Sequence, residues 1–262
     1  MLASAWQLPT RAIERAAFMP RAVTYTGEEP WFVRIEAPDA TMVMGVHAPE
    51  GPAREIASDM PVILYFHGTS GCLGNCAAKS AHMAKYTGAQ VVAMEYPGYG
   101  RHPRADGGHP RADDVLANAL ALYDYCARQT PRGVYLVGTS LGTAVAAHVA
   151  SQRPSARSLL LISPLMSAIA VLSLLLARIL WWWDIFPTYR TIRDVQCRTL
   201  IVHGTADRVI PYAHAERLHS LLRAPARTGV VTYEGADHED MFTGNRKYDT
   251  LDCVRFMTTE AE

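Results

Sequence analysis

Ser140 lies at the centre of a Gly-X-Ser-X-Gly pentapeptide, with a strand pattern at 134–137 before it and a helical pattern at 141–152 after it. A serine on such a sharp strand-to-helix turn is exposed at the edge of a sheet, and the flanking glycines leave room for a strained backbone. The pentapeptide alone is a weak signal, and its plainer interpretation is a glycine-rich turn whose serine caps the helix. The flanking strand and helix favour Ser140 as a nucleophile.

The residues that a serine nucleophile needs follow it in the chain. Its hydroxyl needs a general base near neutral pH, and the base needs a carboxylate to orient it. Asp207 comes soon after the apolar run 200–202, and His238 comes soon after the run 230–233. Either residue alone could be a helix cap or a solvated loop residue. The order Ser, Asp, His at successive strand ends indicates a catalytic triad.

Acyl transfer also needs hydrogen-bond donors for the oxyanion that develops on the substrate. One expected donor is the backbone N–H of Leu141, the residue after the nucleophile, and the other belongs to the loop after the third strand. That loop begins with His67-Gly68-Thr69, so the Thr69 N–H is the second candidate. We interpret His67 as a structural side chain that anchors the loop.

The elements that must position these residues are visible as apolar runs separated by helical patterns. Strands are predicted at 31–36, 41–47, 62–66, 91–94, 134–137, 159–162, 200–202 and 230–233, and helices at 77–86, 112–128, 141–152, 212–222 and 246–257. Runs that are apolar on consecutive residues suit strands covered on both faces, as in a parallel sheet with crossover helices. The pattern predicts an α/β, doubly wound, mostly parallel eight-stranded sheet that opens with an antiparallel pair.

Composition narrows the classes of function. The chain has 262 residues, and its 25 Lys and Arg residues balance its 25 Asp and Glu residues. That length suits one domain spanning 1–262, and without a long run of either charge no nucleic-acid partner is expected. Five scattered cysteines fit free thiols in a reducing compartment better than a disulfide framework. We therefore expect a cytoplasmic protein.

Two further patterns contain residues that can ligate metals. Cys72 and Cys76 form Cys-X3-Cys, but no second Cys or His pair at zinc spacing follows them. The sequence His-Pro-Arg-Ala-Asp occurs twice, at 102–106 and 109–113, with two glycines between the copies. Proline and glycine make this a surface loop that does not fix ligand geometry. Neither pattern is expected to hold a metal, and no cofactor is expected.

Residues 1–22 are predicted to form an N-terminal extension. The segment carries Arg11 and Arg15 but no apolar core and no small-residue cleavage site, so it is not expected to direct secretion. Its Ala- and Arg-rich composition leaves a transit peptide as an alternative, which Glu14 argues against. A helix packed on the domain is the favoured interpretation.

Several motifs together resemble the α/β-hydrolase superfamily. They are His67-Gly68, Tyr96-Pro-Gly-Tyr-Gly100, Gly138-Thr-Ser-Leu-Gly142, His203-Gly-Thr-Ala-Asp207 and Gly235-Ala-Asp-His238. The chain is similar in particular to the small single-domain branch that contains the acyl-protein depalmitoylases and is related to prolyl-oligopeptidase-type peptidases. Segments 163–165 and 182–187 resemble that branch between the sixth strand and the acid loop. Thr69 stands where the branch usually has Asn, and the first cysteine is Cys72, which speaks against the N-terminal lipid anchor of membrane-bound depalmitoylases.

The segment Leu165–Trp183 has Arg178 as its only charge and is long enough to span a membrane. A single span there would put the nucleophile and the base on opposite sides, so no triad could form. Residues 164–191 are therefore predicted to be a lid or an interfacial insertion, with plain core packing as the alternative. Three consecutive tryptophans suit an interface, because indole has an apolar body and a polar N–H. The acyl-pocket candidates are Trp181, Trp182, Trp183, Leu165 and Met166.

These patterns predict a serine hydrolase that cleaves an ester or thioester with a sizeable apolar acyl group through an acyl-enzyme. The expected partner is an acylated protein or a lipid-like substrate, with peripheral contact to a membrane as one alternative. A prolyl-oligopeptidase-like serine peptidase is the first rival, although the usual propeller or large cap of that type has no room in 262 residues. The second rival is a non-catalytic binding protein of the same fold, which the intact triad argues against.

Overall fold

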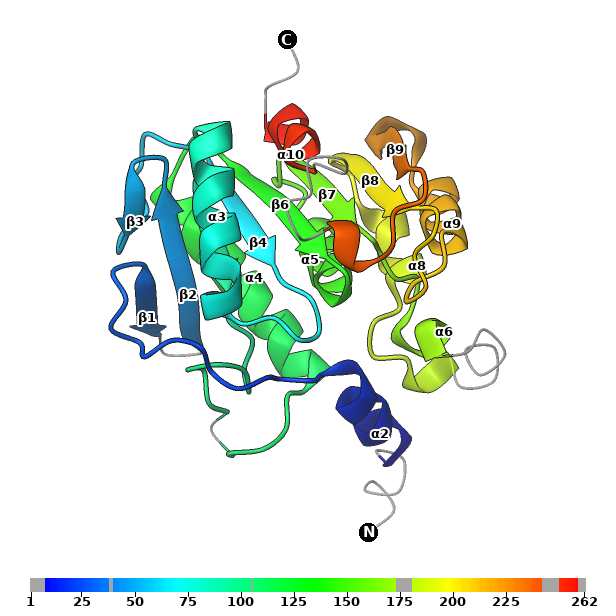
Figure 1. The fold of residues 1–262 in the computed structure, drawn as a ribbon, viewed down its shortest axis with the longest axis horizontal. Coiled ribbons are helices and arrows are strands. Elements are labelled where there is room, and N and C mark those ends of the chain that lie inside the picture. Colours follow the sequence, from blue (N-terminus) through cyan, green and yellow to red (C-terminus); the bar gives the residue numbers. More distant parts are fainter. Residues whose placement is uncertain (1–7, 38–39, 105, 173–180, 242–249, 259–262) are drawn as a thin grey trace.

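A computed structural model describes residues 8–37, 40–104, 106–172, 181–241 and 250–258 (Figure 1). Its centre is a nine-stranded sheet in the order β1-β2-β5-β4-β6-β7-β8-β9, with β3 paired to β2. The strands are β1 (Phe32–Glu36), β2 (Thr41–Ala48), β3 (Gly51–Ala53), β4 (Val62–Phe66), β5 (Gln90–Met94), β6 (Val134–Thr139), β7 (Ser158–Ile162), β8 (Arg198–Gly204) and β9 (Arg227–Tyr233). The three pairs that involve β2 are antiparallel, and the pairs from β5 to β9 are parallel. The predicted mostly parallel sheet is confirmed, and its additional strand is the short β3.

Helices cover both faces of this sheet. On one face lie α3 (Leu73–Thr87) and α10 (Leu251–Thr258), and on the other lie α4 (Ala112–Gln129), α5 (Leu141–Gln152) and α9 (Ala213–Leu221). The shorter elements are α6 (Ala168–Leu172), α8 (Thr188–Thr191) and the 3-10 turns Trp181–Trp183, Ile192–Asp194, Ala224–Ala226 and Glu239–Met241. The predicted helices have counterparts in these elements, although α3 begins at Leu73 and not at 77. Residues 246–249 of the last predicted helix lie outside the described residues.

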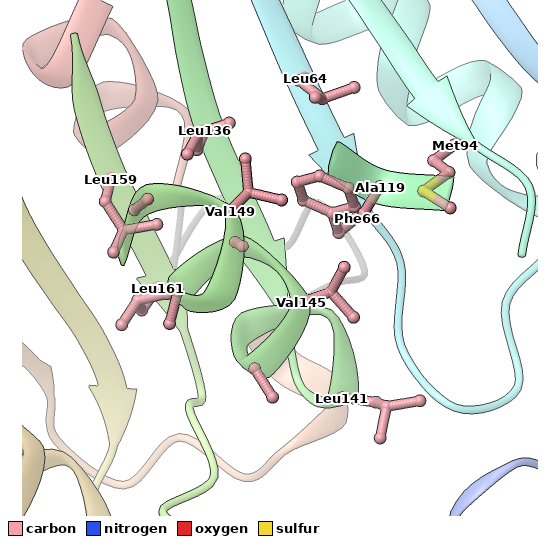
Figure 2. Packing of buried hydrophobic residues seen from close by; sticks show 14 of the residues in the cluster. Leu64, Phe66, Met94, Ala119, Leu136, Leu141, Val145, Val149, Leu159 and Leu161 are labelled. Atoms are coloured by element: carbon pink, nitrogen blue, oxygen red, sulfur yellow. The ribbon is translucent and has the colours of Figure 1, made fainter. Parts of the chain in front are cut away.

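The central strand β4 shows why the apolar runs are continuous. Val62, Leu64 and Phe66 pack toward the α4 and α5 side, whereas Ile63 and Tyr65 pack toward the α3 side. Figure 2 shows Leu64 and Phe66 in the first of these clusters, together with side chains of α5 such as Val145 and Val149. Fully burying such a side chain stabilises the fold by about 1.5–3 kcal/mol. Packing on both faces thus fixes the strand ends that carry the candidate site.

The five cysteines are all buried as free thiols. Burial raises the pKa of Cys76, Cys126 and Cys197 to about 12. A thiol that stays protonated behaves as a small apolar side chain. These three cysteines therefore belong to the packing of the core.

The N-terminal segment and the apolar stretch 165–183 are each described only in part. The N-terminal helix α2 (Leu8–Ala17) contacts α6 and the 3-10 turn Trp181–Trp183. Residues 173–180 of the apolar stretch lie outside the described residues. In the described part of the chain, no helix has both the length and the apolar character that a membrane crossing requires. The boundaries 1–22 and 164–191 stay predictions.

Candidate active site

Ser140 follows β6 directly and occupies a strained turn before α5. Its φ of 51° and ψ of −121° lie in a region that residues with a side chain rarely adopt. Both flanking glycines are needed sterically. A Cβ on Gly142 would collide with the Phe66 carbonyl oxygen, and a Cβ on Gly138 would collide with the Gly142 carbonyl oxygen. The turn therefore presents Ser140 at the carboxyl end of β6.

Asp207 and His238 reach Ser140 from the loops that follow β8 and β9. The Nδ1 of His238 lies 2.7 Å from Asp207 Oδ2, and its Nε2 lies 3.1 Å from Ser140 Oγ. The contact with Asp207 favours the tautomer with the proton on Nδ1, which leaves Nε2 as an acceptor for the serine proton. The structure brings together the three residues that the sequence predicts as a triad.

The surroundings of Asp207 favour its ionised form. Its Oδ1 accepts the backbone N–H groups of Val209 at 2.9 Å and Ile210 at 2.8 Å. Burial alone would raise the pKa of Asp207, but the hydrogen bonds from His238 and from these backbone groups outweigh burial and hold the pKa below its usual value. An ionised Asp207 can hold the imidazole orientation and stabilise an imidazolium.

The carboxylates next to His238 in the sequence make other contacts. Asp237 accepts the backbone N–H of Arg208 at 3.0 Å and also binds the Arg208 guanidinium. These bonds lower the pKa of Asp237 to about 2. Asp240 accepts the backbone N–H of Asp237 at 2.9 Å. Asp207 is therefore the carboxylate that is hydrogen-bonded to Nδ1 of the His238 ring.

The loop after β4 lies against the nucleophile. A Cβ added to Gly68 would lie 3.3 Å from the Cβ of Ser140, so the backbone approaches the serine closely there. Thr69 lines the same cavity as Ser140 and Leu141. The backbone N–H groups of Thr69 and Leu141 thus belong to residues that border the space where a substrate carbonyl would lie.

Buried side chains hold this loop in place. The Tyr96 hydroxyl donates to the His67 carbonyl at 2.6 Å, and the Tyr99 hydroxyl donates to the Thr69 carbonyl at 2.7 Å. The His67 ring lies 4.1 Å from the Tyr96 ring, and its Nε2 lies 3.3 Å from Oε1 of the buried Glu95. These contacts suit the anchoring role that the sequence suggests for His67.

An apolar cavity of about 210 Å3 opens beside Ser140. Its lining comes from five regions of the chain: Ile13, Ala16, Ala17 and Met19; Thr69; Ser140 and Leu141; Leu165, Ala168 and Val171; Val209 and Ile210. None of these described lining residues carries a charge. The cavity is therefore suited to an apolar group attached to the carbonyl that Ser140 would attack.

The predicted acyl-pocket residues lie in different places. Leu165 lines the cavity, whereas Met166 is half-buried outside the lining set and donates its backbone N–H to His214 Nδ1 at 3.2 Å. Trp182 is 67% exposed, and Trp183 packs half-buried against the core. The side chain of Trp181 lies outside what the structure describes. Neither Trp182 nor Trp183 lines the cavity, because the N-terminal helix forms that wall.

Sequence reasoning missed the contribution of α2. Its residues Ile13, Ala16 and Ala17 line the cavity, and their helical spacing gives an apolar stripe that the sequence does show. The stripe indicates that the helix buries one face. It does not indicate that this face lies at the cavity beside Ser140, where Ile13 is buried and Ala16 stays exposed, because the opposing residues lie far along the chain.

Comparison with known proteins gives the family. A family model described as serine aminopeptidase, S33, matches residues 58–191. The chain belongs to this α/β-hydrolase family. The matched range contains Ser140 and the loop with Thr69, and it ends before Asp207. Membership supports hydrolase activity in general.

Curated relatives extend the match beyond that range. The α/β-hydrolase domain-containing protein aho-3 of Caenorhabditis elegans is 29% identical over 182 residues, which is 68% of this chain and 52% of the relative. The human α/β-hydrolase domain-containing protein 17C is 28% identical over 182 residues, 68% of this chain and 53% of the relative. The chain thus spans about half the length of these two relatives. An uncharacterised protein of Mycobacterium tuberculosis is 32% identical over 217 residues, 75% of this chain and 74% of the relative.

Solved structures show the same fold. Esterase 2 of Thermogutta terrifontis has a TM-score of 0.66 and 20% identity, covering 88% of this chain and 95% of the esterase. The monoacylglycerol lipase of Paleococcus ferrophilus has a TM-score of 0.63 and 16% identity, covering 83% of this chain and 98% of the lipase. At this identity the likeness concerns the fold alone.

Proposed function

We propose that this protein is a serine hydrolase that cleaves esters or thioesters with an apolar acyl group, using Ser140, Asp207 and His238. The observation that carries the proposal is the 3.1 Å contact between Ser140 Oγ and His238 Nε2, directly beside an apolar cavity. Contacts of this length lie within reach for direct proton transfer.

The proposed reaction has two halves. Ser140 Oγ attacks the substrate carbonyl carbon while its proton passes to His238 Nε2. His238 then gives that proton to the departing alkoxide or thiolate as the bond to the leaving group breaks. A water molecule next attacks the acyl-serine with His238 as base, which releases a carboxylic acid and restores Ser140.

Two backbone donors would stabilise the charged intermediate. In each half of the reaction negative charge develops on the carbonyl oxygen, and the Leu141 and Thr69 N–H groups are our candidates to bind it. Loss of one such donor in other hydrolases costs about 10²–10³ in kcat. Buried tyrosines hold the backbone of the Thr69 loop, so no large rearrangement is needed on binding.

The cavity favours an acyl group over a peptide amino terminus. An aminopeptidase must bind a charged ammonium group, which requires a carboxylate or comparable acceptors. No carboxylate stands among the described residues that line the cavity. At about 210 Å3 the space is also smaller than the roughly 300–1,000 Å3 of sites that enclose drug-sized ligands. Both properties support binding of a single apolar chain.

The rim of the cavity supports an acylated protein or a lipid as the source of that chain. Met19 is 56% exposed and Val209 is 50% exposed, and both line the cavity. Large apolar side chains exposed around an opening are typical of surfaces that contact lipid or another protein. We also propose that the protein is cytoplasmic and contacts a membrane surface peripherally.

A substrate panel separates the proposal from its rivals. Purified wild-type protein and Ser140→Ala should be assayed on short- and long-chain acyl thioesters, the matching p-nitrophenyl esters and aminoacyl p-nitroanilides. We expect turnover of the long-chain thioesters and esters by the wild type alone. Faster turnover of the anilides would make the protein a peptidase, and no turnover of any substrate would favour the non-catalytic alternative.

A further inference from the structure

The two copies of His-Pro-Arg-Ala-Asp, the 102–106 copy and the 109–113 copy, have different environments. In the first copy Arg104 binds Asp106 at 2.7 Å through Nη2 and also pairs with Asp114. In the second copy Arg111 directly precedes α4 and is exposed. Among the described residues, no carboxylate forms an ion pair with Arg111. The repeat therefore contains one arginine that is neutralised and one that is not.

The N-terminal helix α2 adds two more arginines beside this loop. Glu14 of α2 is only 6% exposed and accepts the backbone N–H of Ala112 at 3.0 Å, so it joins α2 to the start of α4 (Figure 1). Arg11 and Arg15 flank Glu14 on the same helix and are exposed. In the described structure neither of them forms an ion pair.

A second cavity, of about 230 Å3, lies between α2 and the repeat loop. Its lining contains four arginines (Arg11, Arg15, Arg104 and Arg111), the carboxylates of Glu14 and Asp106, and loop residues 108–110. This arginine cavity is separate from the apolar cavity at Ser140, which is lined by the other face of α2.

The charges inside the arginine cavity do not cancel. Glu14 is engaged by the Ala112 N–H, and Asp106 is engaged by Arg104 and by the Gly108 N–H at 2.9 Å. The bonds from Arg104 hold the pKa of Asp106 well below its usual value, so its charge persists and neutralises that arginine. The bond from the Ala112 N–H leaves the charge of Glu14 in place, so Glu14 can offset one of the three remaining guanidinium groups, those of Arg11, Arg15 and Arg111. The cavity keeps an excess of positive charge, and these like charges repel unless an anion joins them.

We propose that this cavity binds a phosphate group. Guanidinium groups present donors in a planar fork that matches phosphate oxygens, and such charge-assisted bonds are among the strong ones in proteins. The cavity is smaller than the roughly 300 Å3 at which sites for drug-sized ligands begin. It therefore suits a phosphate headgroup and not a whole nucleotide. The Ala112 N–H at the start of α4 is not available to the phosphate, because Glu14 already accepts it.

Phosphate binding at the arginine cavity does not require the proposed hydrolase activity. The phosphate can belong to a soluble phosphate compound or to the headgroup of an anionic lipid, since both present the same oxygens to the three arginines. In either case the bound phosphate would link the arginine face of α2 to the repeat loop, while the apolar face of α2 lines the cavity at Ser140.

The test compares two charge-matched double variants of the full chain. Arg15→Gln with Arg111→Gln removes two of the three unpaired arginines, and Arg128→Gln with Arg217→Gln removes two exposed arginines elsewhere. Inorganic phosphate is titrated into each protein by calorimetry at constant ionic strength, and thermal melts without phosphate establish that each variant is folded. We expect saturable binding to the wild type and the control variant, with at least about tenfold weaker binding to the first variant, since each lost charged hydrogen bond contributes about this much.

A second arm distinguishes the sources of the phosphate. Co-sedimentation with phosphatidylcholine vesicles, with and without phosphatidic acid, is measured for the same proteins. A lipid headgroup is identified if the wild type binds vesicles that contain phosphatidic acid, if inorganic phosphate competes with this binding, and if the first variant does not bind them. Saturable phosphate binding without vesicle preference would identify a soluble phosphate compound. Equal affinity of the two double variants, or no binding by the wild type in either arm, would overturn the proposal.

Discussion

The candidate active site has two sides that are built differently. On the sheet side, Ser140, Asp207 and His238 follow the ends of three parallel strands, and their side chains are linked by contacts of 2.7 and 3.1 Å. On the cap side, α2 and α6 place Ile13, Ala16 and Ala168 around the apolar cavity. The strands β6 and β8 of the sheet side are buried on both faces, and β9 at the sheet edge is partly exposed, whereas the cap side is two short helices that contact each other.

This difference divides the residues that would catalyse the reaction from the residues that would select the substrate. Residues on the sheet side bear on bond breaking, so changes there should affect all substrates alike. Under the proposed function, residues on the cap side would contact only the acyl chain, so the effect of changes there should depend on the length of that chain. Substitutions on each side test this division, and the expected loss of activity or stability decreases from the nucleophile to the cap.

Loss of the nucleophile should have the largest effect, on every substrate. Ser140→Ala removes the atom that forms the acyl-enzyme, and loss of one triad member costs about as much as loss of all three, about 10⁶-fold in kcat. Steady-state hydrolysis of a short and a long p-nitrophenyl ester measures the loss, with a thermal melt to establish that the fold is intact. Turnover within tenfold of the wild type on either ester would contradict the assignment.

Asp207→Asn should lower kcat by about 10⁴ while KM stays near the wild-type value. The amide favours the wrong imidazole tautomer but leaves the cavity unchanged. Asp240→Asn is the matched control, because Asp240 accepts a backbone N–H in the His238 loop, whereas Nδ1 of the His238 ring is bonded to Asp207. The same two esters serve for both variants, and a larger kcat loss in Asp240→Asn would show that the acid is misassigned.

His214 links α9 to the segment between β7 and α6, and it should make stability depend on pH. Burial lowers the pKa of His214 from 6.5 to about 4, and its neutral Nδ1 accepts the Met166 N–H beside the cap. Because the folded pKa lies below the unfolded one, the stabilisation is complete above pH 6.5 and is lost as pH falls toward 4. The expected loss is about 3 kcal/mol at most, at 1.36 kcal/mol per pKa unit.

Urea unfolding at pH 7 and at pH 4.5 measures this contribution. His214→Asn keeps an acceptor for the Met166 N–H but does not titrate, so it should lose less stability between the two pH values than the wild type. The other buried histidines titrate in both proteins, so their contributions cancel except for that of His203, whose charge also lowers the pKa of His214. An identical pH dependence in the two proteins would rule out this role for His214.

A larger side chain on the cap side of the apolar cavity should change activity least, and it should affect long-chain substrates selectively. Ala16→Phe places a ring on the α2 face that lines the apolar cavity, whereas Ala12→Phe adds the same ring at an exposed position outside the lining. If the ring displaces two methylenes at about 0.8 kcal/mol each, kcat/KM for the long ester should fall about tenfold. The short ester should be little affected. Equal losses on both esters would mean that the cap does not sort substrates by length.

The sheet side of the candidate active site could be predicted from the sequence because the residues that indicate it are close together in the chain. A strand, a glycine-flanked turn and a helix stand together around Ser140, and each partner follows its own strand. The cap side depends on contacts between distant segments, so the stripe Ile13, Ala16 and Ala17 indicates a buried face but not what it covers. Trp182 illustrates the same limit, because its aromatic character suggests a pocket wall while the fold leaves it 67% exposed.

Peptide mapping after labelling with a fluorophosphonate tests the central claim most directly. This reagent phosphonylates a serine only when a neighbouring base activates it, so it reports the Ser140–His238 contact without any assumption about the natural substrate. We expect one adduct per wild-type chain, on Ser140, and none on Ser140→Ala. An adduct on another residue, or equal labelling of Ser140→Ala, would contradict the account.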